Sequence, residues 1–214
     1  EGARRIAAAL AAGVRGRAAW DGACALRRLG LRGNGVGDRG ADALADGLLV
    51  GGSCLEDLDL AENRIGVAGA RALASVLRRG AGALRALDIS GNVIGSGGAR
   101  ALAEALAAGG GASLERLGLA RNKLEAAGAL ALAAAVARRP PRLALLEVQD
   151  NHISAAGLEA LAEASQKAPS LECIRADGNF PGEGQTLRLE NLQQLPPEQP
   201  PCEPLSPSGR AWRG

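Results

Sequence analysis

A pattern of nine positions, L-x-x-L-x-L-x-x-N with aliphatic substitutions for leucine, occurs six times along this chain and constrains its fold most strongly. Successive asparagines of the pattern are 28 to 30 residues apart. A fixed period of this length is typical of a solenoid, in which each repeat contacts only its neighbours. The asparagines are Asn34, Asn63, Asn92, Asn122, Asn151 and Asn179.

Each repeat predicts a short strand, a tight bend and a helix. The leucines alternate with period two, which indicates a strand with one buried face. The asparagine closes the strand, and its side-chain amide can hydrogen-bond the backbone of its own and the adjacent turn. We therefore interpret all six asparagines as structural.

The second half of each repeat has apolar residues at helical spacing, as in GARALASVL from Gly69 and GARALAEAL from Gly98. The segment GARRIAAAL from Gly2 has the same pattern, so the sequence begins inside a repeat whose strand is missing. The predicted fold is an α/β solenoid shaped as a horseshoe, with a parallel inner sheet and outer helices.

These strand-plus-helix repeats resemble the leucine-rich repeats of the ribonuclease-inhibitor type, over roughly residues 1 to 180. Repeats of this type occur in ribonuclease inhibitors, in the C-terminal regions of NOD-like receptors and in the Ran GTPase-activating protein. The resemblance implies an intracellular protein with α/β horseshoe curvature. It does not imply one function, because a fold carries many functions.

Composition narrows the classes of partner. The 214 residues include no Tyr, no Met and one Phe, so the core must be built from small aliphatic layers. The net charge of +2 comes from interleaved acidic and basic residues, which disfavours a nucleic-acid footprint. No apolar run approaches the roughly 20 residues that cross a bilayer. We expect a monomer that binds a protein and neither nucleic acid nor membrane.

The four cysteines are far apart and form no metal-binding pair; they are Cys24, Cys54, Cys173 and Cys202. Free thiols in a reducing compartment are favoured over disulfides, which predicts a cytoplasmic location.

Two segments depart from the repeat. An insertion at Gly13–Gly22 contains Trp20, which would either form a binding loop or fold back over the exposed first layer. Residues 181–214 follow the repeat domain of residues 1–180, and we expect a capping turn at Thr186–Leu195 and then a Pro-rich disordered tail.

In one helix, Leu130 occupies an outer position that is polar in the other repeats, so it is either a docking residue or an ordinary exposed leucine.

The sequence contains no recognisable catalytic constellation. Its one histidine, His152, lies beside Asn151 in a column also filled by Gly35, Arg64 and Lys123, which indicates a solvated turn. Phosphate-loop, nucleophile-elbow and metal-ligand spacings are missing. We therefore expect no enzyme, no cofactor and no metal.

The candidate binding face is the concave wall, where side chains alternate with the buried leucines. Its predicted residues are Arg28, Arg32, Asp57, Asp59, Asp88, Arg116, Glu147, Gln149, Arg175 and Asp177. Acidic residues concentrate in repeats two and three with basic residues on either side, a pattern that would select a partner of complementary charge. The other interpretation is a solvated face with no tight ligand.

The predicted function is a protein-binding scaffold or sensor, as in NOD-like receptors. The alternative is a GTPase-activating regulator similar to the Ran protein.

Overall fold

The computed structural model describes residues 1–15, 26–51, 54–79, 83–138 and 142–179. Helices and strands alternate along these ranges. The helices are α1 (Gly2–Arg15), α2 (Gly37–Gly51), α3 (Val67–Arg79), α4 (Gly95–Ala107), α5 (Glu125–Arg138) and α6 (Ala155–Lys167). The strands are β1 (Arg28–Gly30), β2 (Asp57–Asp59), β3 (Ala86–Asp88), β4 (Arg116–Gly118), β5 (Leu145–Glu147) and β6 (Cys173–Arg175).

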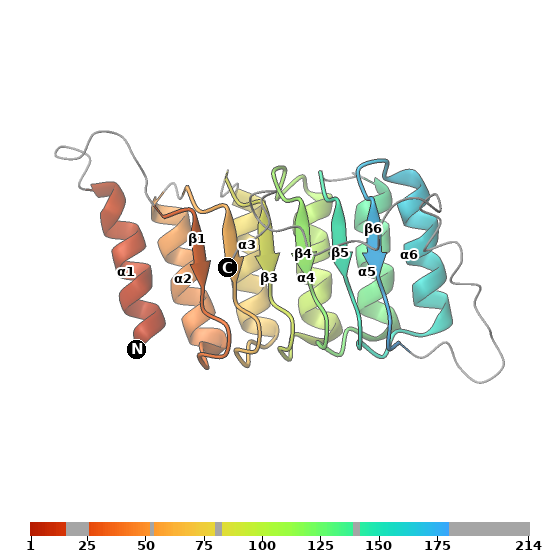
Figure 1. Cartoon of the computed structure of the whole chain (residues 1–214), viewed down its shortest axis with the longest axis horizontal. Coiled ribbons are helices and arrows are strands. Elements are labelled where there is room, and N and C mark those ends of the chain that lie inside the picture. The colour runs from red at the N-terminus through yellow and green to blue at the C-terminus, as the bar shows by residue number, and fades with distance from the viewer. Residues whose placement is uncertain (16–25, 52–53, 80–82, 139–141, 180–214) are drawn as a thin grey trace, which may run out of the picture.

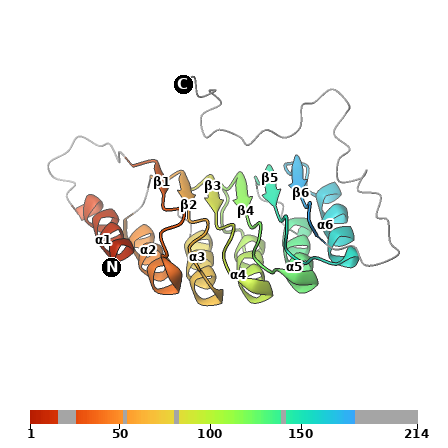
Figure 2. The same cartoon turned by 60° about the horizontal axis from the view of Figure 1, so that its bottom comes forward.

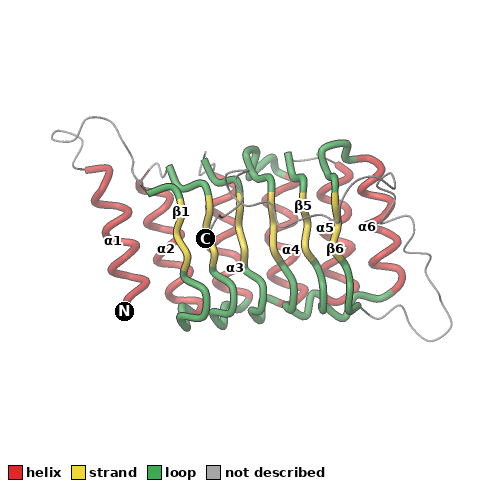
Figure 3. The backbone as a smooth tube through the Cα atoms, viewed as in Figure 1, coloured by secondary structure: helices red, strands yellow, loops and turns green. Residues whose placement is uncertain are grey.

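The strands form one parallel sheet in the order β1 to β6, with each strand beside its neighbour in sequence (Figure 1). The register places equivalent residues of adjacent repeats side by side, so that Leu58 lies beside Leu29 and Leu87. A loop leads from each of β1 to β5 to the helix that follows it (Figure 3). The predicted α/β leucine-rich repeat solenoid is confirmed.

The helices form a second layer on one face of the sheet. Each helix packs against the next one along the chain. In Figure 2 the two layers follow a shallow arc, with the strands on its inner side and the helices on its outer side. The other face of the sheet is therefore the concave wall of the solenoid.

The core between the two layers is aliphatic. The central leucines Leu58, Leu87 and Leu117 are at most 1% exposed. Helix positions such as Leu73 and Leu102 pack on them from the other layer and are equally buried. Stacked rows of leucine thus replace the aromatic residues that a globular core of this size would normally contain.

The insertion predicted at Gly13–Gly22 begins later in the structure than the sequence suggested. Residues Gly13–Arg15 belong to the last turn of α1 and are not part of a loop. The rest of the insertion, Trp20 included, lies outside the described residues, as do the capping turn at Thr186–Leu195 and residues 181–214 as a whole. The prediction that the GARRIAAAL segment is helical is confirmed.

Two cysteines, Cys54 and Cys173, are half-buried, whereas Cys24 and Cys202 lie outside the described ranges. The thiol state therefore stays a prediction. Leu130 is 48% exposed on α5, as expected for its outer position. Within the described ranges, no helix combines the length and apolar character that a membrane span requires.

Candidate binding face

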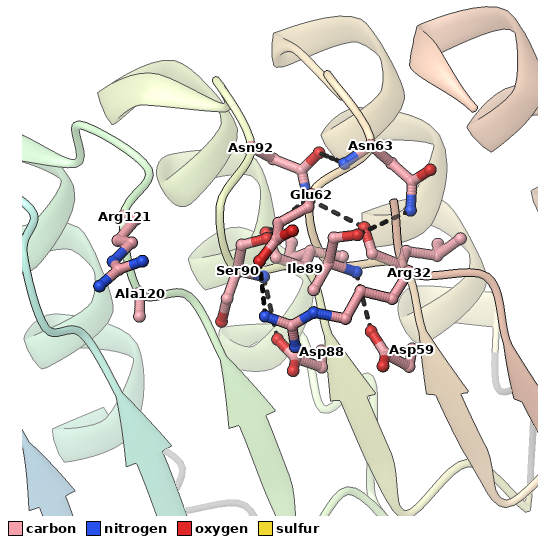
Figure 4. A network of polar contacts seen from close by, with 12 residues as sticks. Arg32, Asp59, Glu62, Asn63, Asp88, Ile89, Ser90, Asn92, Ala120 and Arg121 are labelled. Carbon is pink, nitrogen blue, oxygen red and sulfur yellow. Dashed lines mark hydrogen bonds and ion pairs between the residues drawn. The ribbon is translucent and has the colours of Figure 1, made fainter. Parts of the chain in front are cut away.

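The asparagines form a ladder of side-chain hydrogen bonds along one end of the strands. The Oδ1 atom of Asn63 accepts bonds from the backbone N–H groups of Asn34 (3.0 Å) and Val36 (3.1 Å) in the preceding repeat. Its Nδ2 atom donates to the carbonyls of Leu31 (2.8 Å) and Ala61 (2.9 Å). Figure 4 shows the next step, in which Asn92 bonds to the backbone of Asn63. Each amide thus joins its own turn to the preceding one, as the sequence predicted.

The ladder changes at its first member. Asn34 is exposed, and its Nδ2 atom donates only within its own turn, to the carbonyls of Leu31 and Arg32. The interior members Asn63, Asn122 and Asn151 are completely buried. Burial with satisfied hydrogen bonds supports a structural role for the interior asparagines.

All ten predicted face residues come from β1 to β6 or from the bends that follow them. Three positions of each repeat face the concave side, because side chains alternate along a strand. The register aligns these positions across the sheet, so Asp59 lies directly beside Asp88. The predicted residues therefore share one surface.

Ion pairs between neighbouring repeats neutralise much of the charge near this surface. Before the strands, Arg27 pairs with Glu56 at 2.8 Å and Arg85 pairs with Glu115 at 2.9 Å. In the bends after the strands, Arg32 pairs with Glu62 at 2.7 Å. Surface pairs of this kind add little stability, about 0–1 kcal/mol each, but they cancel charge. Glu56 and Glu62, two acidic residues of the second repeat, are therefore neutralised by Arg27 and Arg32.

On β2 and β3, three carboxylates of the concave face have no ion pair to a described residue, and we name Asp57, Asp59 and Asp88 the acidic patch. Asp59 accepts the N–H of Ala61, and Asp88 accepts the N–H of Ser90, each at 2.9 Å. These bonds use one oxygen of each carboxylate and hold it against its own strand (Figure 4). The second oxygen of each carboxylate makes no hydrogen bond to a described group.

Glycines flank the acidic patch on both sides. At the position of Asp59 and Asp88, the outer neighbours are Gly30 on β1 and Gly118 on β4. A side chain at Gly118 would lie 2.5 Å from the Oδ1 atom of Asp88, so only glycine leaves that carboxylate its place. Asp88 thus lies over Gly118, whereas no other group lies within 4 Å of the Cβ position of Gly30, beside Asp59.

Burial raises the pKa of Asp57 above the ordinary value of an aspartate, while the positive charges of Arg116 and Arg28 act in the opposite direction. The like charges of Asp59 and Asp88 raise the pKa further. Ionised Asp57 is therefore less favourable in the folded chain than in the unfolded one. A residue that costs stability at neutral pH is typical of a functional surface.

We expect Asp57→Asn to stabilise the fold at neutral pH, because the amide carries no charge to be desolvated. At about pH 3, below the ordinary aspartate pKa, both forms are neutral and the advantage should disappear. The gain should develop as the pH rises from the ordinary aspartate pKa to the raised pKa, and it should be complete above the raised pKa. Urea unfolding of both proteins at pH 3 and pH 7 measures the difference, and an equal gain at both pH values would contradict the assignment.

Glu147 departs from the prediction that it faces solvent. It lies on the concave side but is only 8% exposed, because Arg116 (2.8 Å) and Arg175 (3.3 Å) pair with it from the two neighbouring strands. Three of the predicted binding residues thus form one cluster, in which two arginines share a single carboxylate. Its formation required the register of β4, β5 and β6, which the spacing of a single repeat does not reveal.

The face also contains an apolar residue that the prediction missed. Leu145 occupies the concave position of β5 that Arg116 occupies on β4, and it is 3% exposed. The signal was present in the sequence, since LALLEV carries one more leucine than the repeat requires. Gln149 follows in the bend, and its Oε1 atom is buried without a hydrogen-bond partner among the described residues. Asp177, in the last bend, is exposed.

The described residues include no cluster of His, Cys, Asp or Glu that is placed to hold a metal ion. His152 is an exposed bend residue with φ of 57°, like Arg64 and Lys123 in equivalent positions. Gly35 has a positive φ of 62° in the same column, so four of its members adopt a left-handed backbone.

Comparison with known families supports a leucine-rich repeat protein. A family model described as Leucine Rich repeat matches residues 23–45, 53–74, 84–103 and 144–162. The matches cover parts of the repeats that contain β1, β2, β3 and β5. The unmatched repeat between them, with β4 and α5, has the same strand–helix geometry. A search of curated proteins finds no match to this chain.

Proposed function

We propose that this leucine-rich repeat protein is a non-enzymatic protein-binding scaffold, and that its partner binds the concave face. The wall of a solenoid offers a continuous surface built from several repeats, and such surfaces typically serve as binding sites. The proposed site centres on the acidic patch. Arg28 and Arg32 lie on one side, and Arg116, Glu147, Gln149, Arg175 and Asp177 lie on the other.

The observation that carries the proposal is the uneven neutralisation of charge. Cross-strand ion pairs cancel part of the charge beside the patch, whereas Asp57, Asp59 and Asp88 lie next to one another without an ion pair to a described residue. A partner with lysine or arginine side chains would complement these carboxylates. Charge complementarity of this kind selects the partner and speeds association more than it increases affinity.

The finer parts of the proposal come from the sequence resemblance. We propose a monomeric cytoplasmic protein with a regulatory or sensor role of the NOD-like receptor kind. The alternative, a GTPase-activating regulator, is distinguished by whether the chain accelerates GTP hydrolysis by a small GTPase. Acceleration would replace the scaffold proposal with that alternative.

The experiment compares capture of partners from a cell extract by the unmodified chain and by Asp57→Lys, Asp59→Lys and Asp88→Lys combined. We expect the triple variant to lose about tenfold or more in affinity for the captured partner, because attraction becomes repulsion across the patch. The difference should shrink as salt rises, since the screening length is about 10 Å at 0.1 M. Mass spectrometry identifies the partner, and titration measures its affinity.

Two controls isolate the charge of the patch. Asparagine at the same three positions keeps the oxygens that accept the N–H groups of Ala61 and Ser90, so its effect should be intermediate. Charge reversal at Arg71 and Arg100, both exposed on the convex helices, should leave binding unchanged. If the convex variant loses the partner and the concave variant retains it, the site lies on the helices and Leu130 becomes the better candidate.

A further inference from the structure

One positive charge of this chain lies close to the acidic patch. Arg32, in the bend after β1, pairs with Glu62, in the bend after β2, at 2.7 Å. Figure 4 shows the side chain of Arg32 extending across β2 toward Asp88 and Ser90. The guanidinium group therefore lies beside the patch, although the backbone of Arg32 belongs to the preceding repeat.

The burial of Ala61 agrees with this path of the side chain. Ala61 occupies the concave position after β2 and is completely buried, whereas Ala120, at the equivalent position after β4, is only half-buried. An alanine cannot cover itself, so neighbouring side chains must exclude water from Ala61. Arg32 begins beside it, where the N–H of Gly33 donates to the carbonyl of Ala61 (3.0 Å), and its apolar stem is suited to this role.

The carboxylates of the patch act on Arg32 through their charge. The hydrogen bond that Arg32 donates to Glu62 raises the pKa of the guanidinium most, while partial burial acts in the opposite direction. The negative charges of Asp59 and Asp88 raise this pKa further. The charged form of Arg32 is therefore stabilised by two of the carboxylates that form the centre of the proposed binding site.

Arg121 shows that a position close to the patch does not by itself bring a guanidinium to it. Arg121 lies in the bend after β4, one strand away from Asp88, whereas Arg32 lies two strands away. Its side chain pairs with Asp150 of the following repeat at 3.2 Å, and in Figure 4 it lies apart from the patch. The carboxylate with which each arginine pairs therefore decides which of the two lies beside Asp59 and Asp88.

We propose that Arg32 is a built-in occupant of the acidic patch, which the lysine or arginine side chain of a partner protein displaces. Glu62 is the positioning residue that holds Arg32 in this place. The inference rests on the proposed binding at the concave face, and it adds a residue that sets how strongly a cation binds there. A guanidinium already beside Asp59 and Asp88 weakens the attraction for a second cation, so it selects against partners with little positive charge.

Displacement of Arg32 leaves the rest of the patch in place. More than half of each side chain in the Arg32–Glu62 pair is exposed, and exposed pairs of long side chains contribute little stability. Asp59 and Asp88 are held separately, by the N–H groups of Ala61 and Ser90. The arginine can therefore move away while both carboxylates keep their positions.

The probe is trilysine, acetylated at one end and amidated at the other, titrated into the nitrogen-labelled full chain. The amides of Ala61 and Ser90 report directly on the patch, because they donate to Asp59 and Asp88 at 2.9 Å. We expect the probe to shift both resonances in proton–nitrogen correlation spectra, which also show whether each variant is folded. A salt concentration of about 0.1 M limits the screening length to about 10 Å, so distant charges contribute little.

Arg32→Gln is expected to increase the affinity for trilysine about three- to fivefold, because a competing cation is lost. The matched control is Arg121→Gln, which removes the same charge at the same end of the strands, but from a side chain turned toward Asp150. The control should change the affinity by less than about 1.5-fold. Both arginines are more than half exposed, so neither substitution removes a core contact.

Glu62→Gln tests the positioning role. Without the carboxylate of Glu62, Arg32 can move onto Asp59 and Asp88, so the affinity for trilysine should fall about threefold. In the Arg32→Gln background the same substitution should cause a smaller loss, because no arginine is left to be released. This double-mutant cycle separates the positioning of Arg32 from the charge of Glu62 itself.

Two results would overturn the inference and leave the acidic patch as the proposed site. Equal effects of Arg32→Gln and Arg121→Gln would reduce the role of Arg32 to its contribution to net charge. Equal losses from Glu62→Gln with and without Arg32 would show that Glu62 does not act by holding the arginine. A different result, no shift at Ala61 and Ser90 even in Arg32→Gln, would remove the patch as a cation site, and with it both this inference and the centre of the proposed function.

Discussion

Replacing Asn92 with alanine is expected to lower the free energy of unfolding by about 3 kcal/mol. The side chain is 4% exposed, and its Oδ1 atom accepts bonds from the N–H groups of Asn63 (3.0 Å) and Ile65 (2.8 Å). Its Nδ2 atom donates to the carbonyls of Leu60 (3.0 Å) and Ile89 (2.7 Å). Alanine would leave several buried backbone groups without partners, and each such group costs about 1–3 kcal/mol before the surroundings relax.

Chemical denaturation followed by circular dichroism measures this loss. Asn34→Ala is the control, because Asn34 is exposed and bonds only within its own turn. We expect the control to lose less than about 1 kcal/mol, since solvent can replace bonds at an exposed site. Equal losses at the two positions would mean that the bonds to the preceding repeat contribute nothing and that the ladder is not a stabilising element.

Gly98→Val is expected to cost about 3 kcal/mol through overpacking. Gly98 is buried on α4, and a Cβ atom there would lie 2.8 Å from the Cβ of Ile94 and 2.9 Å from the Cβ of Ala70 on α3. Both atoms are attached directly to the backbone, so they can yield only if the first turn of α4 distorts and α4 moves away from α3. Removing a glycine from a helix gains at most about 1 kcal/mol, which is too little to compensate.

The adjacent glycine provides the matched comparison. A Cβ at Gly97 would meet Val67 Cγ1 at 3.3 Å, a side-chain atom that can shift by a few tenths of an ångström. Gly97→Ala should therefore leave stability unchanged or increase it slightly, through the better helix propensity of alanine. Thermal unfolding of both variants tests the pair. A Gly98 variant as stable as the Gly97 variant would show that the spacing of α3 and α4 is not set by this contact.

The repeat period alone predicted the architecture, because one short pattern specifies a buried strand face, a bend and a helix, and six copies must stack. Particular residues confirm this. Leu58, Leu87 and Leu117 fall in register on the sheet, and Asn63 and Asn92 bond to the preceding turn as expected. Leu130 is exposed at its outer position, and the segment from Gly2 is a helix. Local patterns suffice for these features because each depends on one repeat and its nearest copy.

Only the tertiary structure decided which charged side chains lack an ion pair and are available to a partner. Asp59 and Glu62 look alike in the sequence, yet Glu62 is paired with Arg32 from the previous repeat and Asp59 is not. Glu147 was predicted as an exposed binding residue, and Arg116 and Arg175 cover it from both sides. The partners of these side chains lie 28 to 31 residues away along the chain, at distances set by strand register and side-chain rotamers. The sequence therefore determined which face of the sheet carries charge. Packing between repeats determined which carboxylates on that face remain unpaired, because an ion pair depends on a few ångströms that a repeat pattern does not specify.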